Sequence, residues 1–173
     1  MIFPCIFHIP QHMLPWVMFM KWKTYGFWIA LAEGVGLLSG YLSREAQNLY
    51  SEFIHKPPLS PPAILFPIVW TILYALMGIG IARVRLKDGE GKKRATGLFL
   101  LQLTVNFFWS LIFFNAQAFA LAFLWLVLLW VAVYGMIRQF AKDDALSAKL
   151  QIPYLLWLTF AAYLNAGVFL LNR

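Results

Sequence analysis

Residues 116–137 read AQAFALAFLWLVLLWVAVYGMI, a run without one charged side chain. An α-helix rises 1.5 Å per residue, so a helix of this length crosses the hydrocarbon core of a bilayer, which is about 30 Å thick. The rest of the chain has the same character. Of its 173 residues, 62% are hydrophobic and only 12% are charged, whereas soluble domains carry about 25% charged residues. The sequence therefore predicts an all-α integral membrane protein.

Four further apolar stretches are long enough to cross a bilayer. They lie at about Thr24–Leu42, Ile64–Ala82, Ala95–Phe114 and Leu150–Leu171. The first is the least apolar, because it contains Glu33 and several glycines. Together with Ala116–Ile137, these stretches predict a bundle of five transmembrane helices formed by residues 24–173.

Residues 1–23 are predicted to be an N-terminal extension outside this fold. Pro4, Pro10 and Pro15 interrupt the apolar segment there, and proline breaks a continuous helix. Cys5, His8 and His12 lie in the extension, but Pro10 breaks the helix that would align the histidines, so no metal site is expected.

The basic residues predict the orientation in the membrane. Five spans place 11 of the 14 Lys and Arg on one side, in the N-terminal segment and in two loops, and 3 on the other side. Cytoplasmic loops carry the excess of Lys and Arg. We therefore expect a multi-pass protein of the cell membrane, with a cytoplasmic N-terminus and an outside C-terminus. Because this topology accounts for the net charge of +7, no nucleic-acid partner is predicted.

Three of the spans each carry a tryptophan with a polar or small residue at helical spacing. The sets are Trp70 with Tyr74, Asn106 with Trp109, and Trp157 with Ala161 and Asn165. Spacings of three, four and eight place each set on one face of its helix. Amides and hydroxyls need partners in a bilayer, so these faces are expected to point inward and to converge on one pocket. Hydrogen bonding between packed helices is the alternative explanation, above all for Asn106.

The signatures of conventional enzymes are missing from the predicted spans. No histidine or cysteine lies inside one, and no phosphate-binding glycine loop or carboxylate pair is present. A pocket of indole, phenol and amide groups suits a large, flat, apolar ligand with a few polar edges.

Two features of the first span have both a functional and a structural interpretation. Glu33 is the only acidic residue inside a span, which marks it either as functional or as a neutral acid bonded to a neighbouring helix. Gly36 and Gly40 form a G-x-x-x-G pattern, which is typical of close helix contact and suggests a homodimer.

Other residues are predicted from their position along the chain. Tyr154 suits the interfacial aromatic belt, and Trp130 is a better pocket candidate than Trp125.

Residues 55–62, HKPPLSPP, contain four prolines, so they form either a stiff connection or a rigid lid over the bundle.

Taken in order, these motifs resemble the TspO/MBR family of tryptophan-rich sensory proteins and mitochondrial translocator proteins. The motifs are Lys56-Pro57…Pro61-Pro62…Phe66-Pro67-x-x-Trp70-x-x-x-Tyr74, Gln102-x-x-x-Asn106-x-x-Trp109, and Pro153-Tyr154-x-x-Trp157…Leu164-Asn165. The likeness runs from about Thr24 to Asn172.

The resemblance implies a five-helix bundle that binds protoporphyrin IX or haem-like tetrapyrroles in a pocket opening toward the first loop. It implies a homodimer, no required cofactor, and in some members a light-dependent breakdown of porphyrin. By position, the pocket would be lined by Trp70, Tyr74, Asn106, Trp109, Trp157 and Ala161. Trp70 and Trp157 would be the catalytic, photochemical pair, and Asn106 the polar contact to the ligand.

Two positions depart from the family pattern. Leu59 stands where the loop usually has tryptophan, and Ala166 stands where the C-terminal cholesterol motif needs tyrosine, so cholesterol handling is not expected. Two other functions remain open, namely transport of porphyrins or other hydrophobic molecules and a scaffold whose tryptophans only pack.

Overall fold

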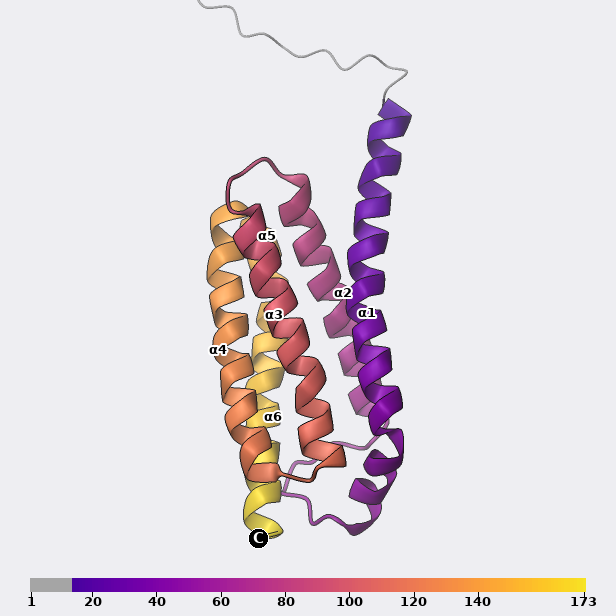
Figure 1. The fold of residues 1–173 in the computed structure, drawn as a ribbon, viewed down its shortest axis with the longest axis vertical. Coiled ribbons are helices and arrows are strands. Elements are labelled where there is room, and N and C mark those ends of the chain that lie inside the picture. The colour runs from indigo at the N-terminus through magenta and orange to yellow at the C-terminus, as the bar shows by residue number, and fades with distance from the viewer. Residues whose placement is uncertain (1–13) are drawn as a thin grey trace, which may run out of the picture.

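The computed structural model describes the backbone of residues 14–173 and the side chains of residues 21–173. This part of the chain is mostly helical and contains no strand (Figure 1). The helices are α1 (Leu14–Phe53), α2 (Leu65–Leu86), α3 (Lys92–Ser110), α4 (Phe119–Asp143), α5 (Ala145–Lys149) and α6 (Ile152–Leu171). A π-helical turn, η2 (Leu111–Asn115), continues α3. Cys5, His8 and His12 lie outside the described residues.

Four helical segments are long and apolar enough to cross a membrane. They are Leu65–Leu86, Lys92–Asn115, Phe119–Asp143 and Ala145–Leu171, with mean hydropathies between 1.7 and 2.4. Each corresponds to one predicted span, so the predicted all-α membrane fold is confirmed. The fifth span is not confirmed, because α1 is not among these segments. Glu33 and the glycines lower the mean hydropathy of α1.

α1 is longer than the span predicted for it, with 40 residues from Leu14 to Phe53 in place of Thr24–Leu42. Pro15 falls in its first turn, where proline is tolerated. Beyond Leu42 no proline or glycine interrupts the helix before Pro57 and Pro58. The predicted boundary between extension and bundle at residue 24 stays a prediction.

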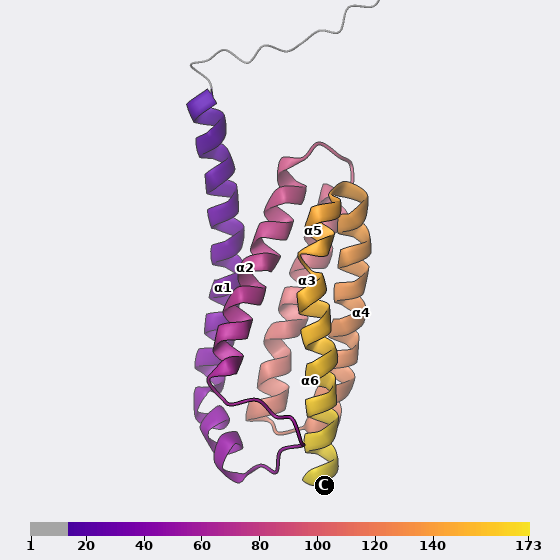
Figure 2. The ribbon, with the colours of Figure 1, turned by 180° about the vertical axis from the view of Figure 1, so that it is seen from behind.

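The helices run side by side and their connections gather at two ends (Figures 1 and 2). α1 packs mainly on α2, α3 on α4, and α4 on α6. One end holds the first turns of α1, the α2–α3 loop and the α4–α5 junction. These are the three basic segments, so the structure groups them as the charge pattern predicted. The other end holds the 54–64 loop and the C-terminus.

Glycines allow α1 and α2 to approach closely. A Cβ atom added to Gly78 would lie 2.5 Å from Cα of Ile29, and one added to Gly36 would collide with the ring of Tyr74. A Cβ atom added to Gly40, in contrast, would meet no atom within 4 Å. The first glycine of the G-x-x-x-G pattern is therefore used for packing within the chain.

Asp144 joins α2 to the α4–α5 junction. Its carboxylate accepts hydrogen bonds from Arg83 Nε at 2.7 Å and from Lys87 Nζ at 2.7 Å. It also accepts from Ser147 Oγ at 2.7 Å and caps the start of α5. Although the carboxyl is buried, Arg83 and then Lys87 hold its pKa well below the ordinary value.

Candidate ligand-binding site

The inner face of α2 carries three aromatic residues at spacings of four. Trp70 and Tyr74 lie with their ring centroids 5.4 Å apart and their planes at 30°. Phe66 lies one turn earlier on the same face. The first of the three predicted faces therefore exists as a continuous aromatic surface.

Tyr154 of α6 connects this surface to α3. Its ring packs edge-on against Trp70 at 6.1 Å. Its hydroxyl accepts a hydrogen bond from Asn106 Nδ2 at 3.0 Å and donates one to Gln102 Oε1 at 3.1 Å. All three hydrogen-bonding side chains are buried. Trp70, Tyr74 and Asn106 are thus brought together through Tyr154, a residue that sequence reasoning did not assign to the pocket.

The prediction that Tyr154 lies in the interfacial aromatic belt is wrong, because its side chain is 0% exposed. Pro153 suggested that the span begins nearby. The short helix α5 precedes α6, however, and the apolar segment begins at Ala145. Tyr154 therefore lies nine residues after the start of this segment. A signal was present in the sequence, since Tyr154 and Trp157 are three residues apart and share a face.

Trp109 lies in a second aromatic cluster, nearer the end of the bundle that holds the 54–64 loop. Its ring stacks on Phe113 at 5.2 Å, with the planes at 23°. Its Nε1–H is buried and has no hydrogen-bond partner among the described residues. Asn165 donates from Nδ2 to the carbonyl of Phe119 at 2.8 Å, while its Oδ1 is likewise buried and unpaired. Buried polar atoms are normally paired, so these two are candidates for contact with a ligand or a water.

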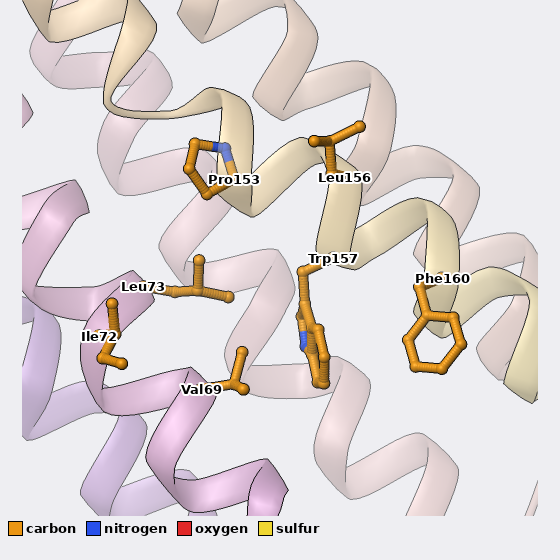
Figure 3. Close-up of a pocket in the computed structure, with 7 residues that line it drawn as sticks. All are labelled: Val69, Ile72, Leu73, Pro153, Leu156, Trp157 and Phe160. Carbon is orange, nitrogen blue, oxygen red and sulfur yellow. The ribbon is translucent and has the colours of Figure 1, made fainter. Parts of the chain in front are cut away.

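An apolar groove runs between α2 and α6 (Figure 3). Its volume is about 430 Å³, and it is lined by Val69, Ile72, Leu73, Pro153, Leu156, Trp157 and Phe160. Ile72 and Leu156 are more than half exposed, so the groove opens on the outer surface. Of the six predicted pocket residues, only Trp157 lines it.

Trp157 and Trp70 lie along the same seam between α2 and α6. Trp157 packs edge-on against Phe66 at 5.9 Å, and Trp70 packs against Tyr154. The two indoles are therefore carried by neighbouring turns of facing helices. Ala161 is buried one turn beyond Trp157. Among the described residues, the side-chain hydrogen bond of Asn106 goes to Tyr154 and not to Trp157. The common use of Trp157, Ala161 and Asn106 by one ligand stays a prediction.

The interpretation of the fourth span is corrected. Trp130 stacks on the exposed Tyr134 and donates from Nε1 to Thr159 Oγ1 at 3.0 Å, so it lies toward the outer surface of α4 and α6. Trp125 instead faces α3, where its Nε1 donates to the carbonyl of Val105 at 2.8 Å. Helical spacing separates these two tryptophans but does not say which of them points inward.

The 54–64 loop crosses the end of the bundle and is fixed to α6 (Figure 2). Tyr163 donates from its hydroxyl to the carbonyl of Pro58 at 2.9 Å. Asn172 exchanges hydrogen bonds with the backbone of His55 at 3.0 and 2.9 Å. Leu59 is 81% exposed and has a positive φ of 65°, which places it at the tip of a turn. This placement agrees with a lid and leaves Leu59 without a packing role.

Two of the sequence hypotheses concern ionisable groups. Glu33 is half-buried on α1, and its carboxyl forms no hydrogen bond or ion pair with another described residue. Within residues 14–173, no group of three or more His, Cys, Asp and Glu side chains is arranged to hold a metal ion.

Comparison with known proteins places this helical bundle in a family. The model of the TspO/MBR family matches residues 28–171. The tryptophan-rich protein TspO of Chlorobaculum tepidum is 34% identical over 154 residues, which cover 86% of this chain and 96% of that protein. Protein CrtK of Rhodobacter capsulatus is 40% identical over 69% of this chain and 76% of its own length. The translocator protein of Homo sapiens is 32% identical over 87% of this chain and 88% of its own length. The chain therefore belongs to the TspO/MBR family of membrane proteins.

Proposed function

We propose that this membrane protein binds a porphyrin-type tetrapyrrole, such as protoporphyrin IX or haem, and acts as a sensor, scavenger or regulator of porphyrin levels. The observation that carries the proposal is the convergence of Trp70, Tyr74 and Asn106 around Tyr154. Aromatic faces suit a flat ring system, and a few buried polar groups suit its edge. The unpaired Nε1–H of Trp109 is one donor that such an edge would satisfy.

The groove along Trp157 supports a route to this site. It is apolar and opens toward the lipid-facing surface between α2 and α6. A hydrophobic ligand dissolved in the bilayer would reach Trp157 first and the aromatic surface of α2 next. Binding at Asn106 requires its bond to Tyr154 to be shared or broken.

The test is a titration of the purified protein with protoporphyrin IX, followed by tryptophan quenching and by the porphyrin absorption band. Trp70→Phe and Trp157→Ala are each expected to weaken binding by about tenfold, or ~1.4 kcal/mol, the scale of one lost aromatic contact. Trp22→Phe is the control, since Trp22 is 71% exposed at the far end of α1. If both variants bind as tightly as the control, the site is wrongly placed.

Light-dependent porphyrin breakdown is the activity that we propose for Trp70 and Trp157. Both indoles lie on the α2–α6 seam, where a bound ring system would contact them. Product spectra recorded in the dark and in light should show light-dependent loss of porphyrin in the parent protein. The loss should be weaker in each variant even when the porphyrin is saturating.

Transport of porphyrins or other hydrophobic molecules is the second candidate. It is favoured by Glu33, an acidic residue half-buried on α1 without an ion-pair partner among the described residues. Flux of protoporphyrin into proteoliposomes that is abolished by Glu33→Gln would favour transport. Binding without flux would favour the first proposal.

The arrangement in the membrane is also proposed. We infer that α1 is a fifth span, that the basic end faces the cytoplasm, and that the protein forms a homodimer in the cell membrane. The grouping of the basic segments at one end supports this orientation. A membrane-impermeant thiol reagent applied to intact cells should spare Cys5 and should label Arg173→Cys in a Cys5→Ser background.

A further inference from the structure

One face of α4 carries two aromatic and two basic side chains, each four residues after the one before. They are Trp130, Tyr134, Arg138 and Lys142, here called the α4 stripe. This spacing places them above one another on one side of the helix. α4 lies on the side of the bundle away from α1 (Figures 1 and 2). Two aromatic rings are followed by two cations toward the basic end of the helix.

Contacts within the α4 stripe hold three of these side chains in a fixed arrangement. The rings of Trp130 and Tyr134 stack at 5.7 Å with their planes only 9° apart. Arg138 donates from Nη1 to the hydroxyl of Tyr134 at 3.2 Å. Trp130 is fixed from the other side by its bond to Thr159 of α6. The guanidinium keeps its remaining N–H groups for another acceptor.

The α4 stripe faces away from the protein core. Tyr134 is 43% exposed and the neighbouring Val131 is 57% exposed. Arg138 and Lys142 are exposed as well, and neither forms an ion pair with another described residue. Asp144, a nearby acid, is already paired with Arg83 and Lys87. Asp143, the residue after Lys142, accepts a hydrogen bond from Gln139 and forms no ion pair with either cation. No ion pair within the described residues therefore neutralises Arg138 or Lys142.

We propose that the α4 stripe binds one anionic phospholipid. The phosphate lies against Arg138 and Lys142, and an acyl chain lies along the stacked rings of Trp130 and Tyr134. Phosphate oxygens match the planar N–H fork of arginine. Trp130 is twelve residues from Lys142, about 18 Å along the helix, a length that suits a headgroup and the hydrocarbon of one leaflet. Aromatic belt anchoring alone would show no preference for lipid charge, and a free phosphate would make no use of the rings.

The experiment uses the full chain in mixed micelles with brominated phosphatidylglycerol or brominated phosphatidylcholine, which quench nearby tryptophans. The difference in quenching between the parent protein and Trp130→Phe gives the part that comes from Trp130. Each basic residue near the surface contributes about 1 kcal/mol of attraction to anionic lipid, so Arg138→Gln with Lys142→Gln should weaken the preference for phosphatidylglycerol about 30-fold. Tyr134→Phe keeps the ring but releases Arg138, and should give a smaller loss.

Lys93→Gln with Arg94→Gln is the matched control, because both residues are exposed at the same end of the bundle, on α3. This variant removes the same charge and should keep the preference. An equal loss in the control would overturn the proposal, because it would reveal a diffuse surface charge. Displacement of the lipid by an equal concentration of inorganic phosphate would also overturn it. So would a changed oligomeric state of the Arg138→Gln, Lys142→Gln protein, since a second copy would then cover the stripe.

Discussion

Replacing Tyr154 by phenylalanine removes one oxygen atom from the centre of the bundle. The ring keeps its edge-on contact with Trp70, so packing is nearly unchanged. The hydroxyl is lost from two hydrogen bonds, at 3.0 Å to Asn106 and at 3.1 Å to Gln102. Both partners are at most 1% exposed, so water does not replace it readily.

The free energy of unfolding that Tyr154→Phe is expected to remove lies between two figures. Hydrogen bonds between helices within membranes average about 0.6 kcal/mol each, so two bonds give roughly 1.2 kcal/mol as the lower figure. A buried polar group left without a hydrogen-bond partner costs about 1–3 kcal/mol of stability. If one amide is left fully unpaired, the upper figure is therefore about 3 kcal/mol. We therefore expect Tyr154→Phe to lower the free energy of unfolding by about 1–3 kcal/mol.

The measurement is denaturant unfolding in detergent, compared with Tyr163→Phe. Tyr163 lies on the same helix, and its hydroxyl bonds the loop carbonyl of Pro58 at an exposed site. Water can replace that bond, so its loss should cost little. A double-mutant cycle with Asn106→Leu should return a coupling free energy of about 0.5–1.5 kcal/mol. Equal stabilities for Tyr154→Phe and Tyr163→Phe would refute the central role of the hydroxyl.

Two further predictions concern the tight helix contact and the polar corner. Gly36→Ala should be less stable than Gly40→Ala by about 1–3 kcal/mol in the same unfolding assay, since only the first new methyl group collides with Tyr74; equal stabilities would contradict this contact. Asp144→Asn should cost about 1–3 kcal/mol at neutral pH, because Arg83 loses its buried partner while partial exposure moderates the loss. The folded-state pKa of Asp144 is lowered, so its contribution is complete above the ordinary value near 3.8 and disappears as pH falls below it. The stability gap between parent and variant should therefore narrow progressively as pH falls below about 4. A gap independent of pH would mean that the carboxylate charge plays no part.

Periodicity predicted which residues share a face, and this part of the reasoning succeeded. Trp70 and Tyr74 do lie together, and Asn106 does point into the bundle. The stacking of Trp109 on Phe113 also follows from spacing, since they are four residues apart on one helical segment. Helix spacing contains no information on which neighbouring helix a face meets. The contact of Trp125 with the backbone of α3 was for this reason beyond prediction.

The errors at Tyr154 and α1 have a common origin, because both depend on where a helix ends relative to the membrane. Proline at position 153 looked like the start of a span, but Asp144 caps an additional turn of helix before it. In α1, polar residues beyond Leu42 suggested an end, yet nothing in that segment breaks a helix. Hydropathy locates the apolar part of a helix, whereas capping residues and prolines determine its length.

The choice of side chain along each seam explains why the candidate site lies between α2 and α6. On one side of α2, Gly78 lets the backbone of α1 approach, and Gly36 admits the ring of Tyr74. On the other side, Phe66 and Trp70 meet Trp157 and Tyr154 through their rings, so that α6 is kept at a distance and a groove remains. Where two helices meet through aromatic side chains, as α2 and α6 do, rotation of those side chains can make room between them. Where two helices meet through their backbones, as α1 and α2 do, room appears only if a helix moves. A flat ligand would therefore need less rearrangement to enter between α2 and α6, where Trp70 and Trp157 both lie, than to enter between α1 and α2.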